Sequence, residues 1–214
     1  VNMYDDGAHG DGAAGDSIFG ASIDVLSLKT QYYIYAENNN AGKFSPERAE
    51  REFYTLNATI TAATKNDVVI NEYLAFNTSG ISNEKGKKKD WIELYNKTNS
   101  ALGLSSLYLS DSLGLLTRWK FPADAMIKAN EHLLVWADDL DSTSIDLHTN
   151  FNLDDAGEKI VLSDGTNIAD QVSYGTQTAN TGSARCPDGT GSFTATTNTT
   201  PSATNKCLSG MEET

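Results

Sequence analysis

The sequence is poor in the residues that would mark several common protein classes. It has two cysteines and four prolines in 214 residues, and no apolar run approaches the roughly 18 residues that a membrane-spanning helix needs. Basic residues are also scarce, because 16 Lys and Arg stand against 29 Asp and Glu, for a formal net charge of -13. This charge repels phosphate backbones at long range. We therefore expect neither a membrane span nor nucleic-acid binding.

Positive charge is concentrated in one short stretch. Lys85, Lys87, Lys88 and Lys89 lie among small polar residues and Gly86, which favours a solvated loop tip over a phosphate site. The first residues contain neither the charged nor the apolar region of a signal peptide. We expect any targeting signal to lie upstream, in a larger protein.

Helical periodicity is nearly absent. The charged stretch 46–52 has one apolar residue, Ala49, and so would lack a core face; we predict a loop or the start of a strand there. Elsewhere, short β-branched and aromatic runs alternate with Gly, Asn, Asp and Ser, which predicts an all-β sandwich. The predicted strands occupy residues 17–25, 31–37, 52–56, 68–75, 91–96, 107–111, 118–121, 132–137, 159–163 and 168–174.

The predicted strands fall into two groups. The first 57 residues hold three strands and a turn at 38–42, which is too small a set to bury both faces of a sheet. Residues 57–67 are rich in Thr, Ala and Asn and form either a strand continuation or a short linker. We place one domain at 1–63, a β-sandwich at 64–207 and a tail at 208–214.

A series of segments in the second group carries a family resemblance. In chain order they are residues 68–73, 90–96, 119–122 followed by Ile127 and 133–135, 151–153 with 157–162, 174–175, 185–189, and 200–201 with Asn205. In this order they resemble the lamin tail domain, an immunoglobulin-like β-sandwich of nuclear lamins that also occurs as an accessory module in secreted bacterial proteins. Residues 1–63 resemble the C-terminal part of another immunoglobulin-like or fibronectin-like domain. Cys186 departs from the pattern, since relatives usually have another residue there.

The resemblance also implies a role and a setting. It implies a non-catalytic extracellular module, a spacer or a ligand- or protein-binding unit of a larger secreted or surface-anchored bacterial protein. The expected partners are other domains of the same polypeptide, and a surface glycan or protein. Residues 207–214 resemble the linker before a C-terminal secretion signal in Bacteroidetes-type proteins. Four Asn-x-Ser/Thr tripeptides, at Asn57, Asn77, Asn96 and Asn198, suit a secreted eukaryotic protein equally well.

A glycine-rich acidic stretch near the N-terminus is the candidate metal site. Asp5, Asp6, Asp11 and Asp16 offer carboxylates on a backbone whose glycines permit tight turns, and Ca²⁺ takes 6 to 8 oxygen ligands. The spacing differs from the EF-hand loop, and no Glu closes the set. A structural Ca²⁺ site and a solvated loop are both open.

Polar residues in the family segments form a second candidate group. Glu72, Asp90, Glu93 and Asn96 match acidic and Asn positions that recur in the family, where they imply hydrogen bonds to turns and strand ends; metal binding or catalysis is the alternative. Cys186 and Cys207 are 21 positions apart, and both a disulfide and two free thiols are open. A secreted setting favours the disulfide, worth about 3 kcal/mol in the chain-entropy model.

Two other functions have some support in the sequence. A hydrolase could use a carboxylate pair from Asp138, Asp139, Asp141, Asp154 and Asp155. A carbohydrate-binding module could stack sugars on Trp91, Trp119 and Trp136, although each lies in an apolar strand, which favours the core. His9, His132 and His148 have no partner at ligand spacing, so we expect no zinc site. No nucleophile elbow or nucleotide-binding fingerprint is present.

Overall fold

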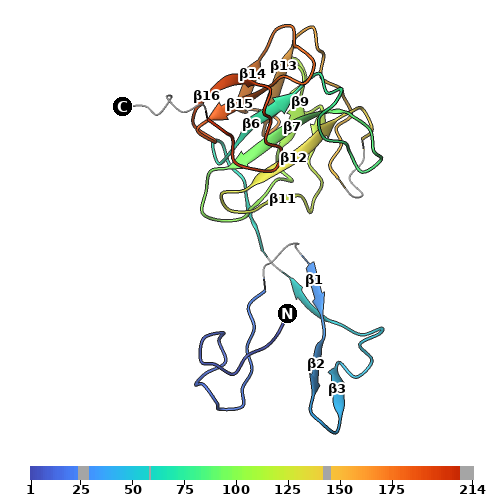
Figure 1. The fold of residues 1–214 in the computed structure, drawn as a ribbon, viewed down its shortest axis with the longest axis vertical. Coiled ribbons are helices and arrows are strands. Elements are labelled where there is room, and N and C mark those ends of the chain that lie inside the picture. The colour runs from blue at the N-terminus through green and yellow to red at the C-terminus, as the bar shows by residue number, and fades with distance from the viewer. Residues whose placement is uncertain (24–28, 58, 142–145, 208–214) are drawn as a thin grey trace. The chain divides into compact units, whose positions relative to one another are not determined.

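The structure is a computed structural model that describes residues 1–23, 29–57, 59–141 and 146–207 (Figure 1). Within these ranges every regular element is a strand, and there is no helix. The chain divides into two compact units, Val1–Thr59 and Ile60–Thr214, so the division falls a few residues before the boundary expected between 63 and 64.

In the described part of the chain, no helix has both the length and the apolar character needed to cross a membrane.

The second unit is an antiparallel β-sandwich of two sheets (Figure 1). The larger sheet has the order β12-β7-β6-β15-β16, and the smaller has the order β10-β9-β13-β14. The larger sheet comprises β6 (Val68–Leu74), β7 (Asp90–Asn96), β12 (His132–Ala137), β15 (Gly182–Cys186) and β16 (Ser192–Thr196). The smaller comprises β9 (Tyr108–Ser110), β10 (Trp119–Lys120), β13 (Lys159–Ser163) and β14 (Ile168–Ser173). A third sheet joins β5 (Thr61–Ala62), β8 (Leu102–Gly103) and β11 (Met126–Ile127), with β5 parallel to β8.

The hydrophobic core lies between the two main sheets. Alternate residues of each strand point inward because successive side chains of a strand face opposite sides. The larger sheet contributes Ile70, Ile92, Leu94 and Val135, all fully buried. The smaller contributes Leu109, Trp119, Ile160 and Leu162, which are at most 3% exposed. The predicted all-β sandwich is confirmed.

The centre of the larger sheet is buried on its second face as well. All seven residues of β6 are buried, which a sheet with one solvated face would not allow. On this outer face, Leu74, Trp91 and Trp136 lie side by side on three neighbouring strands, packed with Ile81 and Leu134. Ile81 comes from the β6–β7 loop, residues 75–89, so this loop covers the tryptophan row.

A β-bulge interrupts β6 beside β7. The pairing passes from Ile70–Leu94 to Glu72–Glu93, which leaves Asn71 as an extra residue. Ile70 and Tyr73 consequently both belong to the core although they are three positions apart. The bulge places Glu72 directly opposite Glu93 on the outer face.

The first unit has two small two-stranded sheets. One pairs β1 (Lys29–Tyr32) with β4 (Tyr54–Asn57), and the other pairs β2 (Ile34–Glu37) with β3 (Gly42–Ser45). Nearly every residue in these strands is exposed. Residues 46–52 form turns, as the lack of a core face predicted, with Arg51 and Glu52 amides donating to the Arg48 carbonyl.

Two strand predictions in the first unit are wrong. Residues 17–25 were expected as a strand, but in the described part, 17–23, only Gly20 pairs, in an isolated bridge with Tyr4; residues 24 and 25 lie outside the description. The carboxylates of Asp5 and Asp16 accept the amides of Ser17 and Ile18, which removes donors that a ladder needs. Residues 31–37 are two strands, because β1 and β2 pair with different partners.

Substitution of Leu94 tests whether the core lies between the two main sheets. Leu94→Ala is expected to lower the free energy of unfolding by about 2–5 kcal/mol, because it removes a fully buried side chain and leaves a cavity between the sheets. Leu113→Ala, at a side chain that is 44% exposed, is the control, with an expected change within about 0.5 kcal/mol. Urea unfolding measures both. Equal effects would contradict the placement of Leu94.

Candidate functional site

A pair of buried carboxyl groups lies at the centre of the outer face. Glu72 on β6 and Glu93 on β7 are opposite each other in the pairing, and both are 0% exposed. The closing segment, residues 197–207, follows β16 and supplies their hydrogen-bond donors. The Thr200 amide donates to Glu72 Oε2 over 3.0 Å, and the Ser202 amide donates to Glu93 Oε2 over 2.5 Å. The closing segment thus covers this half of the outer face, as its red trace in front of the sheet shows (Figure 1).

Amide side chains fix the segments around this pair. Asn71, at the bulge, donates from Nδ2 to Asp188 Oδ1 over 3.0 Å and accepts from the Gly189 amide over 2.9 Å. Asn205 donates from Nδ2 to the Arg185 carbonyl over 2.8 Å, and its own amide donates to Asp188 over 3.1 Å. The bulge, the β15–β16 turn and the closing segment are therefore locked to one another.

The environment raises the pKa of both carboxyl groups. Burial raises the pKa of Glu72 to about 7, although hydrogen bonds from Thr200 favour its ionised form. Burial also raises the pKa of Glu93 to about 8, with the neighbouring Glu72 adding to the effect and the Ser202 amide opposing it. Such values suit acid–base chemistry, but the oxygens are enclosed by the closing segment and have no solvent-exposed surface. The arrangement serves to hold the closing segment.

The structure separates the other two members of the predicted polar group. Asp90 and Asn96 lie at opposite ends of β7. Asp90 accepts the Asn77 amide over 3.0 Å, and burial raises its pKa to about 6. Asn96 is fully buried; its Nδ2 donates to the carbonyls of Ser100 and Lys128, each over 2.8 Å. Both side chains bind turns at the ends of the strand.

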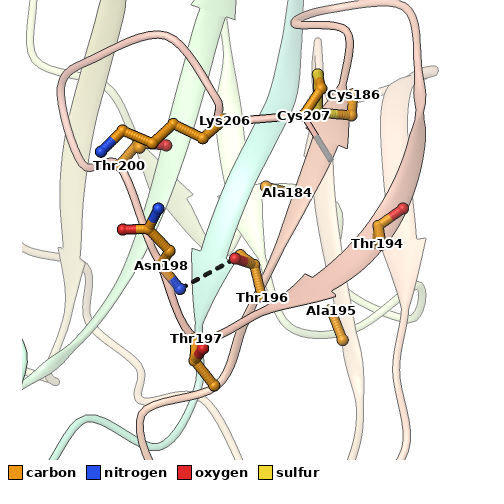
Figure 2. A pocket seen from close by; sticks show the side chains of 10 residues that line it. All are labelled: Ala184, Cys186, Thr194, Ala195, Thr196, Thr197, Asn198, Thr200, Lys206 and Cys207. Atoms are coloured by element: carbon orange, nitrogen blue, oxygen red, sulfur yellow. Dashed lines mark hydrogen bonds between the residues drawn. A yellow bond between two sulfur atoms is a disulfide. The ribbon is translucent and has the colours of Figure 1, made fainter. Parts of the chain in front are cut away.

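A disulfide joins Cys186, at the end of β15, to Cys207, at the end of the described closing segment. Beside it is a hollow of about 530 Å³, lined mostly by small side chains and by Lys206 (Figure 2). Thr196 Oγ1 accepts the Asn198 amide over 3.0 Å at its edge. None of the lining residues is aromatic, so this hollow offers no stacking surface for a sugar.

The four N-terminal aspartates bind the backbone of their own loop. Asp5 accepts the amides of Gly15, Asp16 and Ser17, and Asp16 accepts those of Ala13 and Ile18. The side chain of His9 and the amide of Ala8 hydrogen bond to Asp6 and lower its pKa. Asp11 is 1% exposed; its Oδ2 accepts the Asp6 and Gly7 amides, which lower its pKa, while its Oδ1 is buried without a hydrogen-bond partner.

The carboxylates considered for a hydrolase lie in different places. Asp138 is buried next to His148, and Asp139 and Asp141 are exposed. Asp154 and Asp155 line a surface hollow of about 480 Å³ with Asp90, Asp111 and Glu158. In that hollow Asp111 pairs with Arg118, and Glu158 accepts the Asp154 amide and the Tyr174 hydroxyl. Burial raises the pKa of Glu158.

All three tryptophans are buried. Trp91 is 0% exposed, and Trp119 and Trp136 are each 3% exposed. Their faces are covered by core residues or by the outer row, which is the core placement that their apolar strands favoured. They cannot stack a sugar in this fold.

One cluster escaped the sequence reasoning. His148 is fully buried and lies between Asp138 and Glu84, with Asp146 nearby. Glu84 is 64 positions from His148, in the β6–β7 loop, so ligand spacing in the sequence does not reveal it. The order His148-Thr149-Asn150 after an acidic stretch gives no signal that the β6–β7 loop meets it.

Glu93 is expected to make stability fall as pH rises. Glu72 and Glu93 have a higher pKa in the folded chain than the ordinary 4.5, so the folded state holds more protons above pH 4.5. Their contribution is therefore complete below pH 4.5 and is lost as pH rises through about 7 and 8. The free energy of unfolding should drop by roughly a few kcal/mol between pH 5 and pH 9.

Glu93→Gln isolates this effect because the amide cannot ionise. We expect a smaller loss between pH 5 and pH 9 than in the unmodified chain, measured by urea unfolding at each pH. Glu131→Gln, at an exposed carboxylate, is the matched control and should keep the full loss. Identical pH profiles for Glu93→Gln and the unmodified chain would show that Glu93 does not titrate in this way.

The comparisons with known proteins agree with this architecture. Residues 61–176 match the model of the family described as Lamin Tail Domain. The match runs from β5 past β14, so it includes Glu72 and Glu93, whereas Asp188 and the closing segment lie beyond it. A search of curated proteins finds no match to the chain. Because the matched residues make up more than half of the sequence, the chain belongs to the lamin tail domain family.

Proposed function

We propose that the chain is a non-catalytic accessory module, a spacer or binding unit of a larger secreted or surface-anchored bacterial protein. The observation that carries the proposal is the disulfide between Cys186 and Cys207, which ties the closing segment over the larger sheet. Disulfides persist in oxidising compartments and are rare in the cytosol. A strap of this kind suits a module that must stay folded outside the cell.

The polar side chains of the sandwich support a structural role over a catalytic one. Glu72 and Glu93 are the two carboxyl groups whose pKa values best suit acid–base catalysis. Their oxygens instead accept hydrogen bonds from amides of the closing segment. Asn71 and Asn205 are likewise occupied. These residues rigidify the module, which is what a spacer requires.

The first unit supports a partner in the same polypeptide. Tyr33, Tyr35 and Phe44 are each more than 40% exposed, and the ring of Phe44 contacts those of Tyr33 and Tyr35. Exposed aromatic clusters mark interaction surfaces. We propose that residues 1–63 are the C-terminal part of an immunoglobulin-like or fibronectin-like domain, and that this cluster packs against the rest of that domain.

Two of the four Asn-x-Ser/Thr tripeptides lie where no glycan can be attached in the folded chain. Asn77 and Asn96 are buried and their side chains donate to backbone carbonyls, so neither can carry a glycan in the folded chain. Asn57 and Asn198 are exposed. Their exposure is compatible with secretion from a bacterium or from a eukaryote, and we favour the bacterial setting on the resemblance of the tail.

The proposed setting is tested on protein recovered from its host. Cells are quenched with a membrane-permeant alkylating agent, and the two cysteines are assayed by mass shift. We expect both to be oxidised and the protein to be cleaved by protease added to intact cells. Alkylated Cys186 and Cys207 in protein that protease cannot reach would overturn the extracellular assignment.

The non-catalytic role is tested on the purified chain. We expect no turnover of glycoside, ester or phosphodiester substrates and no retention on polysaccharide gels. Turnover that Glu93→Gln abolishes would establish an enzyme. Retention that Tyr35→Ala abolishes, with Tyr108→Ala as the control in the second unit, would establish a carbohydrate-binding module.

We also propose that the N-terminal loop, residues 5–16, binds Ca²⁺. Asp11 supports this, because its buried Oδ1 lacks a hydrogen-bond donor. A bound cation would offset the cost of burying this oxygen unpaired. Calorimetric titration of the chelated chain with CaCl₂ should show one site that Asp11→Asn weakens at least about 10-fold. Asp124→Asn, at an exposed carboxylate, should leave it unchanged. Equal binding by the two variants would remove the site from this loop.

A further inference from the structure

A buried histidine lies between two carboxylates at the edge of the tryptophan row. His148 is 0% exposed, and its Nδ1 is 3.0 Å from both oxygens of Asp138. On the other side of the ring, Nε2 is 3.0 Å from Glu84 Oε2. Glu84 comes from the β6–β7 loop and Asp138 follows β12, so the ring joins two separate segments.

The chemistry of the ring restricts what can occupy this arrangement. An ionised carboxylate only accepts hydrogen bonds, so Asp138 requires a proton on Nδ1. In a neutral imidazole Nε2 then carries a lone pair, and that lone pair faces the oxygen of Glu84. Two acceptors at 3.0 Å repel each other unless a proton or a metal cation lies between them.

A third side chain decides between a proton and a metal. The ligand atoms of Glu84, Asp146 and His148 all lie within 4.8 Å of one another, and this is the one such group of three found among the described residues. A proton between His148 and Glu84 needs no third partner. A metal ion needs several, and three converging ligand atoms from three places in the chain provide them.

The surrounding contacts orient these ligands in the manner of a metal site. Trp136 Nε1 lies 3.3 Å from Asp146 Oδ2, and the parallel bridge between Trp136 and His148 fixes the backbone of the histidine. Asn83 accepts the amides of Lys85 and Lys87, which forms the turn that carries Glu84, and its Nδ2 reaches Asp138 over 3.3 Å. A carboxylate on the second ring nitrogen, as Asp138 provides, is the usual support of a metal-bound histidine.

We propose that His148 Nε2 and the carboxylates of Glu84 and Asp146 bind a divalent transition-metal ion of the Zn²⁺ type, with water completing the coordination. One imidazole with two carboxylates suits Zn²⁺, whereas Ca²⁺ and Mg²⁺ favour oxygen ligands alone. The ion cross-links the β6–β7 loop to the segment beside β12. It thereby holds the loop over Trp91 and Trp136, and this role is separate from the proposed spacer function.

The test uses the full chain after chelation and dialysis. Calorimetric titration with ZnCl₂ should show one equivalent bound, and Co²⁺ should give the visible absorption of a tetrahedral or five-coordinate site. At about 100-fold excess over the dissociation constant, the midpoint of thermal unfolding of the second unit should rise by about 5 °C or more. Glu84→Gln and Asp146→Asn should each weaken Zn²⁺ binding at least about 10-fold, and Asp138→Asn about 10- to 100-fold.

Two control variants separate this site from others on the chain. His9→Ala removes the half-buried histidine of the N-terminal loop, and Asp124→Asn removes one exposed carboxylate; both should bind Zn²⁺ as the unmodified chain does. Glu84 lies in a loop, so Glu84→Gln keeps the test valid even where a variant of buried His148 fails to fold. Absence of Zn²⁺ binding would overturn the proposal. Binding lost in His9→Ala but kept in Glu84→Gln would overturn it equally.

Discussion

The burial of β6 and β7, the central strands of the larger sheet, on both faces is the constraint on which the rest of the structure depends. A strand that alternates its side chains must then send every second residue into a second interior, and in β7 these residues are Trp91 and Glu93. An apolar side chain is stabilised there directly. A carboxyl group is stable there only if donors are brought to it, because an unpaired buried polar group costs about 1–3 kcal/mol. The bulge at Asn71 and the closing segment provide that solution.

Two segments cover the outer face, and each is held to its half of the face by a different kind of contact. The β6–β7 loop packs Ile81 on the tryptophans, so this half is held by apolar burial and by the polar cluster around His148 at its edge. The closing segment lies on the half that carries Glu72 and Glu93, and amides hold it there. Neither piece has regular secondary structure over the face, and each is fastened by side chains at fixed points. The closing segment is tied covalently through Cys207, and the β6–β7 loop is held by the contact of Glu84 with His148.

Much of the sandwich was predictable from the sequence, because β6, β7, β12 and β13 are long apolar runs with clear boundaries. The short strands β5, β8 and β11 were not, since two residues carry no periodicity. For the site, the sequence singled out Glu72 and Glu93 through the family pattern, but their pairing depends on a bulge, which shifts the register without a composition signal. His148 was set aside because ligand spacing detects partners on one element, whereas Glu84 and Asp138 reach it through the fold. Residues 17–23 do not form the strand that their propensity predicted, because the carboxylates of Asp5 and Asp16 accept hydrogen bonds from the backbone amides there.

The choice of acids beneath the closing segment is not explained by stability alone. Because the pKa of both carboxyl groups is raised, their contribution to the free energy of unfolding is partly lost at neutral pH. Well-packed apolar side chains at the same positions would stabilise the fold as well or better. An apolar patch, however, would hold an irregular segment at any of several registers, since hydrophobic contact is not directional. Glu72 accepts from Thr200 and Glu93 from Ser202, so a shift of one residue would break both sets of hydrogen bonds. We interpret the acids as the device that fixes the register of the closing segment and so brings Cys207 to Cys186.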